Sequence, residues 1–84
     1  MNMTPEQIDA LRSVPVGEST NRLRVAFAIT ERRQAEAVEA LGIAASNMSD
    51  LVNGKYSAVT VETARKFAEF FGCAIEDLFP KRAA

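Results

Sequence analysis

Hydrophobic residues recur at helical spacing along most of this chain, and no segment alternates with the period of two that a strand requires. In the segment that begins near Ser19 or Thr20 and runs to about Thr30, the residues Leu23, Ala26 and Phe27 begin an i, i+3, i+4, i+7 stripe that Thr30 completes. The pattern predicts an all-α fold. The other expected helices cover about residues 5–13, 33–41, 45–52 and 61–71, with a short last helix around 75–79.

Local signals set the ends of these helices. Thr4 can cap the first helix, with Pro5 in its first turn and Gln7 completing a capping box. The run from Val14 to Gly17 then breaks it. Later caps and stops are expected at Gly42, Asn53-Gly54, Thr60, Gly72 and Pro80. Ala44 offers no capping side chain to the fourth helix, so Ser46 could cap it instead, and Thr30 could cap the third.

The helical faces predict the core. Leu11 and Ile8 share one face of the first helix. Further residues expected to point inward are Leu23, Ala26, Phe27, Thr30, Ala37, Val38, Leu41, Ile43, Ala44, Met48, Leu51, Val52, Val61, Ala64, Phe67, Ala68, Phe71, Ile75, Leu78 and Phe79. Val25 and Ile29 lie roughly opposite the stripe of their helix, so a second surface must cover them. That surface is either the N-terminal helix or a second copy of the chain.

Composition limits the chemistry. The chain has 84 residues, which is one domain, and its net charge is −1. It has no His and a single cysteine, Cys73, so we expect no catalytic residues, no metal site and no cofactor. Cys73 is expected in the core rather than in a redox role. No apolar run approaches a membrane span, and the N-terminus has no signal-peptide pattern, so a cytoplasmic protein with no membrane partner is expected.

Residues 34–55 carry most of the functional information. They are expected to form a helix, a turn at Gly42, a second helix and a stop at Gly54, an arrangement that lets a small domain place one exposed helix in a DNA groove. Ser46, Asp50 and Asn53 point away from the apolar face of the second helix. This polar face is either solvated surface or a surface that reads DNA.

From about Arg22 to Phe79 the chain resembles the lambda-repressor-like, Cro-type helix-turn-helix family. The resemblance rests on Gln34, on the turn at 41–43, on the helix end at 51–55 and on the pattern of the last two helices over 60–79. It implies a five-helix domain over residues 19–80, preceded by a short helix and linker at 1–18 and followed by a flexible tail at 81–84. Residues 1–18 could pack on the core, swap to a partner or reach for DNA.

The resemblance also implies site residues. The expected base-reading positions are Ala45, Ser46, Asn47, Ser49 and Asp50. The expected phosphate-contacting positions are Arg32, Arg33, Gln34, Asn53, Gly54, Lys55 and Tyr56. Tyr56 could instead cover the fifth helix. Arg32 replaces a usually apolar residue and Arg33 a usual Ser or Thr cap, and both place positive charge near the expected phosphates.

Two hypotheses of function follow. The first is a DNA-binding transcriptional regulator, a repressor of the phage or mobile-element kind, that binds double-stranded DNA as a homodimer at half-sites roughly 34 Å apart. The second is a protein-interaction module or antitoxin on the same scaffold, favoured by the net charge of −1, by Asp50 and by surplus apolar residues such as Phe70. An enzyme is a distant third.

Overall fold

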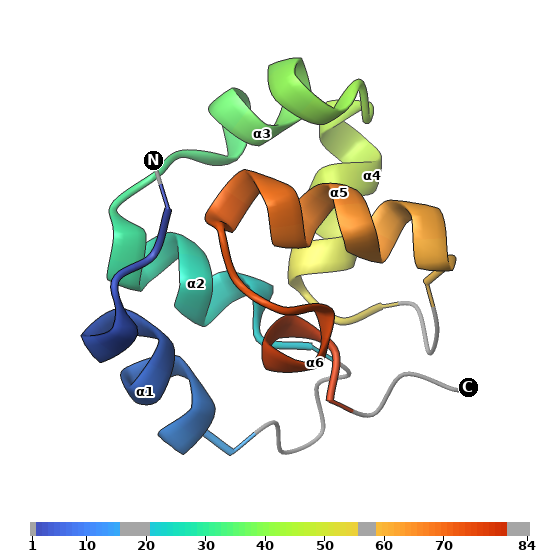
Figure 1. The fold of residues 1–84 in the computed structure, drawn as a ribbon. Coiled ribbons are helices and arrows are strands. Elements are labelled where there is room, and N and C mark those ends of the chain that lie inside the picture. The colour runs from blue at the N-terminus through green and yellow to red at the C-terminus, as the bar shows by residue number, and fades with distance from the viewer. Residues whose placement is uncertain (1, 16–20, 56–58, 81–84) are drawn as a thin grey trace.

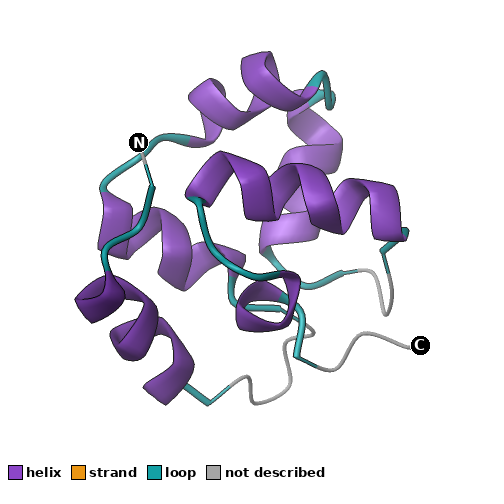
Figure 2. Cartoon of the chain, in the orientation of Figure 1, coloured by secondary structure: helices purple, strands orange, loops and turns teal. Residues whose placement is uncertain are grey.

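The computed structural model describes residues 2–15, 21–55 and 59–80, and these residues form only helices and loops (Figure 2). Its elements are α1 (Pro5–Ser13), α2 (Leu23–Thr30), α3 (Gln34–Leu41), α4 (Ala45–Val52), α5 (Val61–Phe71) and α6 (Ile75–Leu78). The longest of these helices, α5, crosses the middle of the molecule, with α3 beside it and α4 behind it, while α1, α2 and α6 lie on its other side (Figure 1). The predicted all-α fold is confirmed.

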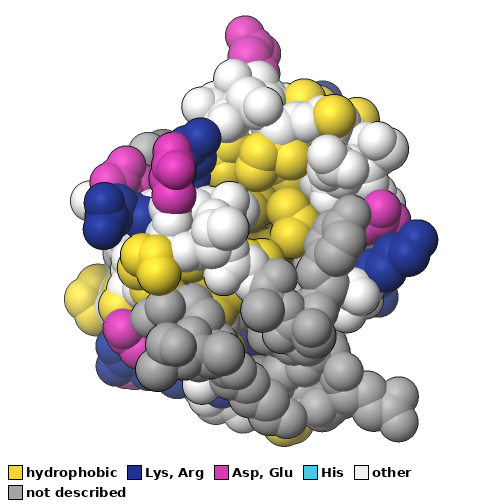
Figure 3. Space-filling model, turned by 90° about the vertical axis from the view of Figure 1, so that its right-hand side faces the viewer, with side chains coloured by type: hydrophobic (Ala, Val, Ile, Leu, Met, Phe, Trp, Pro, Cys, Tyr) yellow, Lys and Arg dark blue, Asp and Glu magenta, His cyan; other side chains and the backbone are white. Residues whose placement is uncertain are grey.

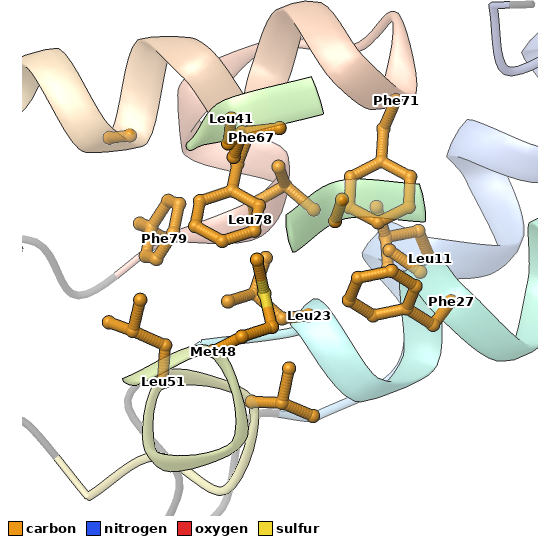
Figure 4. Packing of buried hydrophobic residues seen from close by; sticks show 14 of the residues in the cluster. Leu11, Leu23, Phe27, Leu41, Met48, Leu51, Phe67, Phe71, Leu78 and Phe79 are labelled. Atoms are coloured by element: carbon orange, nitrogen blue, oxygen red, sulfur yellow. The ribbon is translucent and has the colours of Figure 1, made fainter. Parts of the chain in front are cut away.

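One hydrophobic cluster joins all six described helices (Figure 4). Phe67 and Phe71 of α5 are fully buried and supply its centre. The rings of Phe71 and Phe27 lie 5.0 Å apart at 78°, an edge-to-face arrangement that aromatic pairs favour. Since every helix contributes to this cluster, the position of each helix depends on the others.

The N-terminal segment belongs to this core. Leu11 of α1 is fully buried, and α1 packs against both α2 and α6. Met3 is also buried, and its N–H donates to the carbonyl of Phe71 at 2.8 Å. Val25 and Ile29 are half-buried against the cluster. The described part of residues 1–18 therefore packs on the core and against α2, which favours the first of the two explanations for the apolar second face of α2.

Most helix ends lie where the sequence places them. The Thr4 hydroxyl accepts from the Gln7 N–H at 3.1 Å and the Gln7 side chain accepts from the Thr4 N–H at 2.9 Å, which is the predicted capping box. Thr60 caps α5 by accepting from the Thr63 N–H. Gly42 and Gly72 end α3 and α5 in the left-handed conformation.

The start of α2 was predicted too early. The helix begins at Leu23, and Ser19 and Thr20 lie outside the described residues. Asn21 is buried, and its side-chain oxygen accepts from the Leu23 N–H at 3.0 Å. The Arg22 N–H donates to the Leu78 carbonyl at 2.8 Å. These bonds hold the chain in a turn before the helix, and they were not visible in the hydrophobic pattern.

Some expected core and cap positions were also wrong. Val61 is 49% exposed and Ala44 is exposed, because each lies at the N-terminal end of its helix, outside the packed turns. Thr30 is half-buried, but its hydroxyl donates to the Ala26 carbonyl at 2.7 Å within α2. It therefore does not cap α3, whose N-cap is Arg33.

A polar cluster fastens α1 to α6. Asp77 is only 4% exposed, and its carboxylate accepts from Arg12 at 2.5 Å and from the Ala74 N–H at 3.1 Å. Arg22 donates to the carbonyls of Val14 at 2.9 Å and of Asp77 and Arg12 at 3.2 Å. Three of the donors of Arg22 are thus used to join helices, so this arginine has a structural role.

Candidate nucleic-acid interface

The two helices of the predicted helix-turn-helix, α3 and α4, pack against each other and are joined by a tight turn. Gly42 has φ 69°, and its N–H donates to the Val38 carbonyl at 3.0 Å. Nothing in the described structure lies within 4 Å of where a β-carbon on Gly42 would be, so the left-handed backbone alone explains the glycine. Ile43 follows and packs against the core, which fixes the direction in which α4 leaves the turn.

One face of α4 is buried and the other is open to solvent. Met48, Leu51 and Val52 are at most 8% exposed. The expected base-reading positions Ala45, Ser46, Asn47 and Ser49 are all exposed, and Asp50 is half-buried. The fold therefore presents the exposed face that the sequence predicts, held in place by the buried one.

The N-terminal end of α4 has no side-chain cap. Its N-cap residue is Ala44, and Ser46 lies inside the first turn, so the expected capping role of Ser46 is wrong. Ser46 is left with an exposed hydroxyl on the open face. The N–H groups of the first turn of a helix have no partner within the helix, so this end is suited to an acceptor from outside the chain.

The start of α3 combines positive and negative groups. Gln34 and Arg33 are exposed. The N–H groups of Gln34 and Ala35 bond to no acceptor in the described part of the chain. The carboxylate of Glu36, however, accepts from the Arg33 N–H at 3.2 Å and lies 3.4 Å from the Arg32 guanidinium. Sequence reasoning missed this carboxylate, although its position three residues after the N-cap is the usual one for such a cap.

The guanidinium of Arg32 contacts other residues of the chain. Its guanidinium lies 3.5 Å from the centre of the Phe70 ring and also donates to the Phe70 carbonyl. This cation–π contact explains how an arginine replaces an apolar residue here, since its stem and planar head cover the aromatic surface. The sequence indicates neither contact, because Phe70 is 38 residues away along the chain.

The backbone N–H groups that follow α4 are hydrogen-bonded within the chain. The N–H groups of Asn53, Gly54 and Lys55 donate to the carbonyls of Ser49, Leu51 and Asp50, at 3.0 to 3.1 Å. These N–H groups are therefore already bonded within the chain, and the phosphate contacts expected of Asn53, Gly54 and Lys55 stay predictions. The Lys55 ammonium lies 3.8 Å from the Asp50 carboxylate. Tyr56 lies outside the described residues.

Two residues outside the expected base-reading and phosphate-contacting positions, Asn21 just before α2 and Arg24 within α2, contact the end of α4. The Asn21 amide donates to the Leu51 carbonyl at 2.7 Å. Arg24, which is exposed, donates to the side-chain oxygen of Asn53. The charge of Arg24 is visible in the sequence, but its position beside the end of α4 is decided by the packing of α2.

The site thus consists of α4, whose polar face is exposed, and of α3, which precedes it and is joined to it by the turn at Gly42. The N–H groups of Gln34 and Ala35 at the start of α3 are left without an acceptor in the described part of the chain. Residues 22–80 match the Cro/C1-type helix-turn-helix DNA-binding domain. The chain belongs to this family. No curated protein and no solved structure matches the chain. Membership makes α3 and α4 the helix-turn-helix of a DNA-binding domain, as the resemblance implied.

In the described part of the chain, no helix is long and apolar enough to cross a bilayer.

Proposed function

We propose that this protein is a sequence-specific transcriptional regulator, acting as a repressor at a pseudo-palindromic operator. The observation that carries the proposal is the exposed face of α4 in a Cro/C1-type domain, held by the buried side chains of Met48, Leu51 and Val52. A major groove accepts one α-helix, and hydrogen bonds to base edges distinguish the four base pairs. A short polar face on a firmly packed helix fits this task.

The base-reading set is Ala45, Ser46, Asn47, Ser49 and Asp50. Asn47 carries both a donor and an acceptor and can pair bidentately with adenine. Ser46 and Ser49 can serve several bases, and Asp50 can accept from cytosine N4. Lys55, 3.8 Å from Asp50, offsets part of the repulsion between this carboxylate and the DNA phosphates.

We place the phosphate contacts at the two ends of the motif. Gln34, the Arg33 guanidinium and the open amides at the start of α3 serve one end. Asn53, Gly54, Lys55 and Tyr56 serve the other, with Asn53 and Lys55 acting through their side chains. The phosphate contact of Arg32 stays a prediction from the sequence, and its position over Phe70 favours a structural role instead.

A single α4 reads one half-site, so we propose that two copies bind together, with half-sites roughly 34 Å apart. The exposed face of α4 has no Arg or Lys among residues 45–52, which favours modest affinity per copy and hence a dimer. We also propose that the chain divides into residues 1–18, 19–80 and 81–84, and that the protein is cytoplasmic.

The proposal is tested by fluorescence-anisotropy binding at two salt concentrations. Random duplex is compared with fragments from the region flanking the gene. We expect tight, salt-dependent binding to one fragment with two copies per duplex. Asn47→Ala is expected to reduce the ratio of specific to random affinity by about 10- to 100-fold, since a bidentate base contact contributes roughly 1–3 kcal/mol of discrimination.

The control is Ser13→Ala, an exposed polar position on α1 outside the motif. It is expected to leave both affinities unchanged. Equal losses on specific and random DNA in the Asn47 variant would remove Asn47 from the base readers. Weak and indifferent binding of the unmodified protein to every fragment would contradict the operator-binding function itself.

A protein-binding module is the second candidate function. The observation that favours it is an apolar hollow beside α4, lined by residues that include Ile43, Leu51 and Val59 (Figure 3). Asn47 also lines this hollow, so a protein bound there would compete with DNA. A pull-down with the unmodified chain, followed by competition with the DNA fragment, distinguishes the two candidates.

A further inference from the structure

A cation from the arginine-rich segment 22–33, a segment whose charges either contact phosphate or are ordinary solvated surface, lies beside the end of α4. Arg24 belongs to α2, 29 residues before Asn53 in the sequence, yet its guanidinium donates to the Asn53 side-chain oxygen. Asn53 in turn lies 3.5 Å from the Ser49 hydroxyl, with its amide as the donor. A polar chain therefore runs from α2 along the exposed surface of α4.

Three other arginines are already bound within the chain. Arg22 donates to three backbone carbonyls, Arg12 pairs with Asp77, and Arg32 covers Phe70. Arg24 is exposed and has no acidic partner within the described residues. Its bond to Asn53 occupies one of five N–H donors, so most of its donors remain directed at solvent.

The local charge also requires a cation here. The C-terminal end of a helix carries a partial negative charge, and Asp50 adds a carboxylate within the last turn of α4. Lys55 lies 3.8 Å from that carboxylate, so its charge is partly neutralised. A further cation increases the attraction of this end for a phosphate, and Arg24 supplies it.

We propose that Arg24 is a DNA phosphate-binding residue of this domain and that it also orients Asn53 at the end of α4. The proposal rests on the DNA-binding function proposed above. A guanidinium matches the geometry of phosphate oxygens and can bind them with two parallel hydrogen bonds. Such a contact sets the position of α4 along the duplex without reading sequence.

The test compares Arg24→Gln with Arg65→Gln, using the full chain, the operator fragment and random duplex over a range of salt concentrations. Arg65 is the matched control because it is exposed on α5 and has no acidic partner within the described residues. Loss of Arg24 is expected to reduce the slope of log K against log salt by about one and the affinity for both duplexes by about three- to tenfold. Arg65→Gln is expected to keep the slope of the unmodified protein.

Two further variants separate charge from orientation. Arg24→Lys is expected to restore the slope, because the charge returns, but to recover only part of the affinity. Asn53→Ala is expected to weaken binding while keeping the slope, since Arg24 remains. Thermal unfolding of each variant checks that the fold is intact.

A slope for Arg24→Gln equal to those of Arg65→Gln and the unmodified protein overturns the assignment of Arg24 and leaves the DNA-binding function standing. Absence of salt-dependent binding by the unmodified protein overturns both proposals together. The two failures are therefore distinguishable.

Discussion

At the scale of single residues, two glycines with the same backbone conformation have different surroundings. Gly42 and Gly72 both end a helix with positive φ, 69° and 74°. A β-carbon on Gly42 would meet open space, whereas one on Gly72 would lie 2.5 Å from the Cα of Asn2. Gly72 is therefore needed both for its left-handed backbone and for the close approach of Asn2, whereas Gly42 is needed only for its left-handed backbone.

Substituting alanine at the two positions separates the cost of the left-handed backbone from the cost of the clash with Asn2. Gly42→Ala is expected to lower the free energy of unfolding by about 1 kcal/mol, which is the cost of a left-handed alanine. Gly72→Ala is expected to lower it by about 3 kcal/mol, since the clash with Asn2 is added. Denaturant unfolding followed by circular dichroism measures both. Equal losses would show that residues 2–3 do not pack against the end of α5 in solution.

Cys73 is half-buried beside the polar cluster. Burial, and then the charge of Asp77, raise the pKa of its thiol from 9.0 to about 11. A thiol whose pKa is raised by folding stabilises the folded state fully below the unfolded pKa. That contribution is lost as the pH rises from about 9 toward about 11, because only the unfolded chain then gains from ionisation.

Two measurements check this pH dependence. The alkylation rate of Cys73 in the folded chain is expected to rise only toward about pH 11, whereas in denaturant it rises near pH 9. The free energy of unfolding is expected to fall more steeply over this range than in Cys73→Ala, which serves as the control for lysine and tyrosine ionisation. Identical pH profiles for the two proteins would contradict the raised pKa.

At the scale of elements, α1 is the part whose role the sequence left most open. Leu11 is fully buried, and the Arg12–Asp77 pair and the three bonds of Arg22 join the end of α1 to α2 and α6. Helix α2 and the turn before it in turn place Arg24 and Asn21 against the end of α4. Through these contacts α1 supports the elements that hold α4.

Removing the apolar anchor of α1 tests this role. Leu11→Ala is expected to lower the free energy of unfolding by about 2–4 kcal/mol, the usual cost for a fully buried leucine. Asp9→Ala, at an exposed position of the same helix, is expected to change it by less than about 0.5 kcal/mol. Ile8→Ala, at a half-buried position, gives an intermediate value if Leu11→Ala does not fold. A Leu11 variant as stable as the Asp9 variant would mean that α1 is not docked in solution.

At the scale of the whole molecule, a net charge of −1 does not oppose DNA binding if the charges are arranged suitably. Four acidic groups of the described residues are paired with cations: Asp77 with Arg12, Glu36 with Arg32, Asp50 with Lys55 and Glu62 with Lys66. Arg24 and Arg33 are exposed and unpaired with acids in the described chain. The local distribution of free cations is thus more favourable to phosphate than the total indicates.

The helices and the helix-turn-helix motif could be predicted from the sequence alone. Caps such as Thr4 and Gly42 act within a few residues, and the apolar period reports which face of α4 is buried, so both can be recognised locally. The turn at Gly42 and the polar positions of α4 therefore followed from the sequence and from family resemblance, and the family match over residues 22–80 confirms that domain.

Which charged side chains are bound within the molecule and which are left exposed depends on how the helices pack. Arg22, Arg24 and Arg32 look alike in the sequence, but one holds three carbonyls, one lies beside Asn53 and one covers Phe70. The late start of α2 and the cap from Glu36 were likewise set by individual hydrogen bonds. A long side chain reaches partners that are far away in the sequence, so its role depends on how the helices pack rather than on its neighbours in the chain.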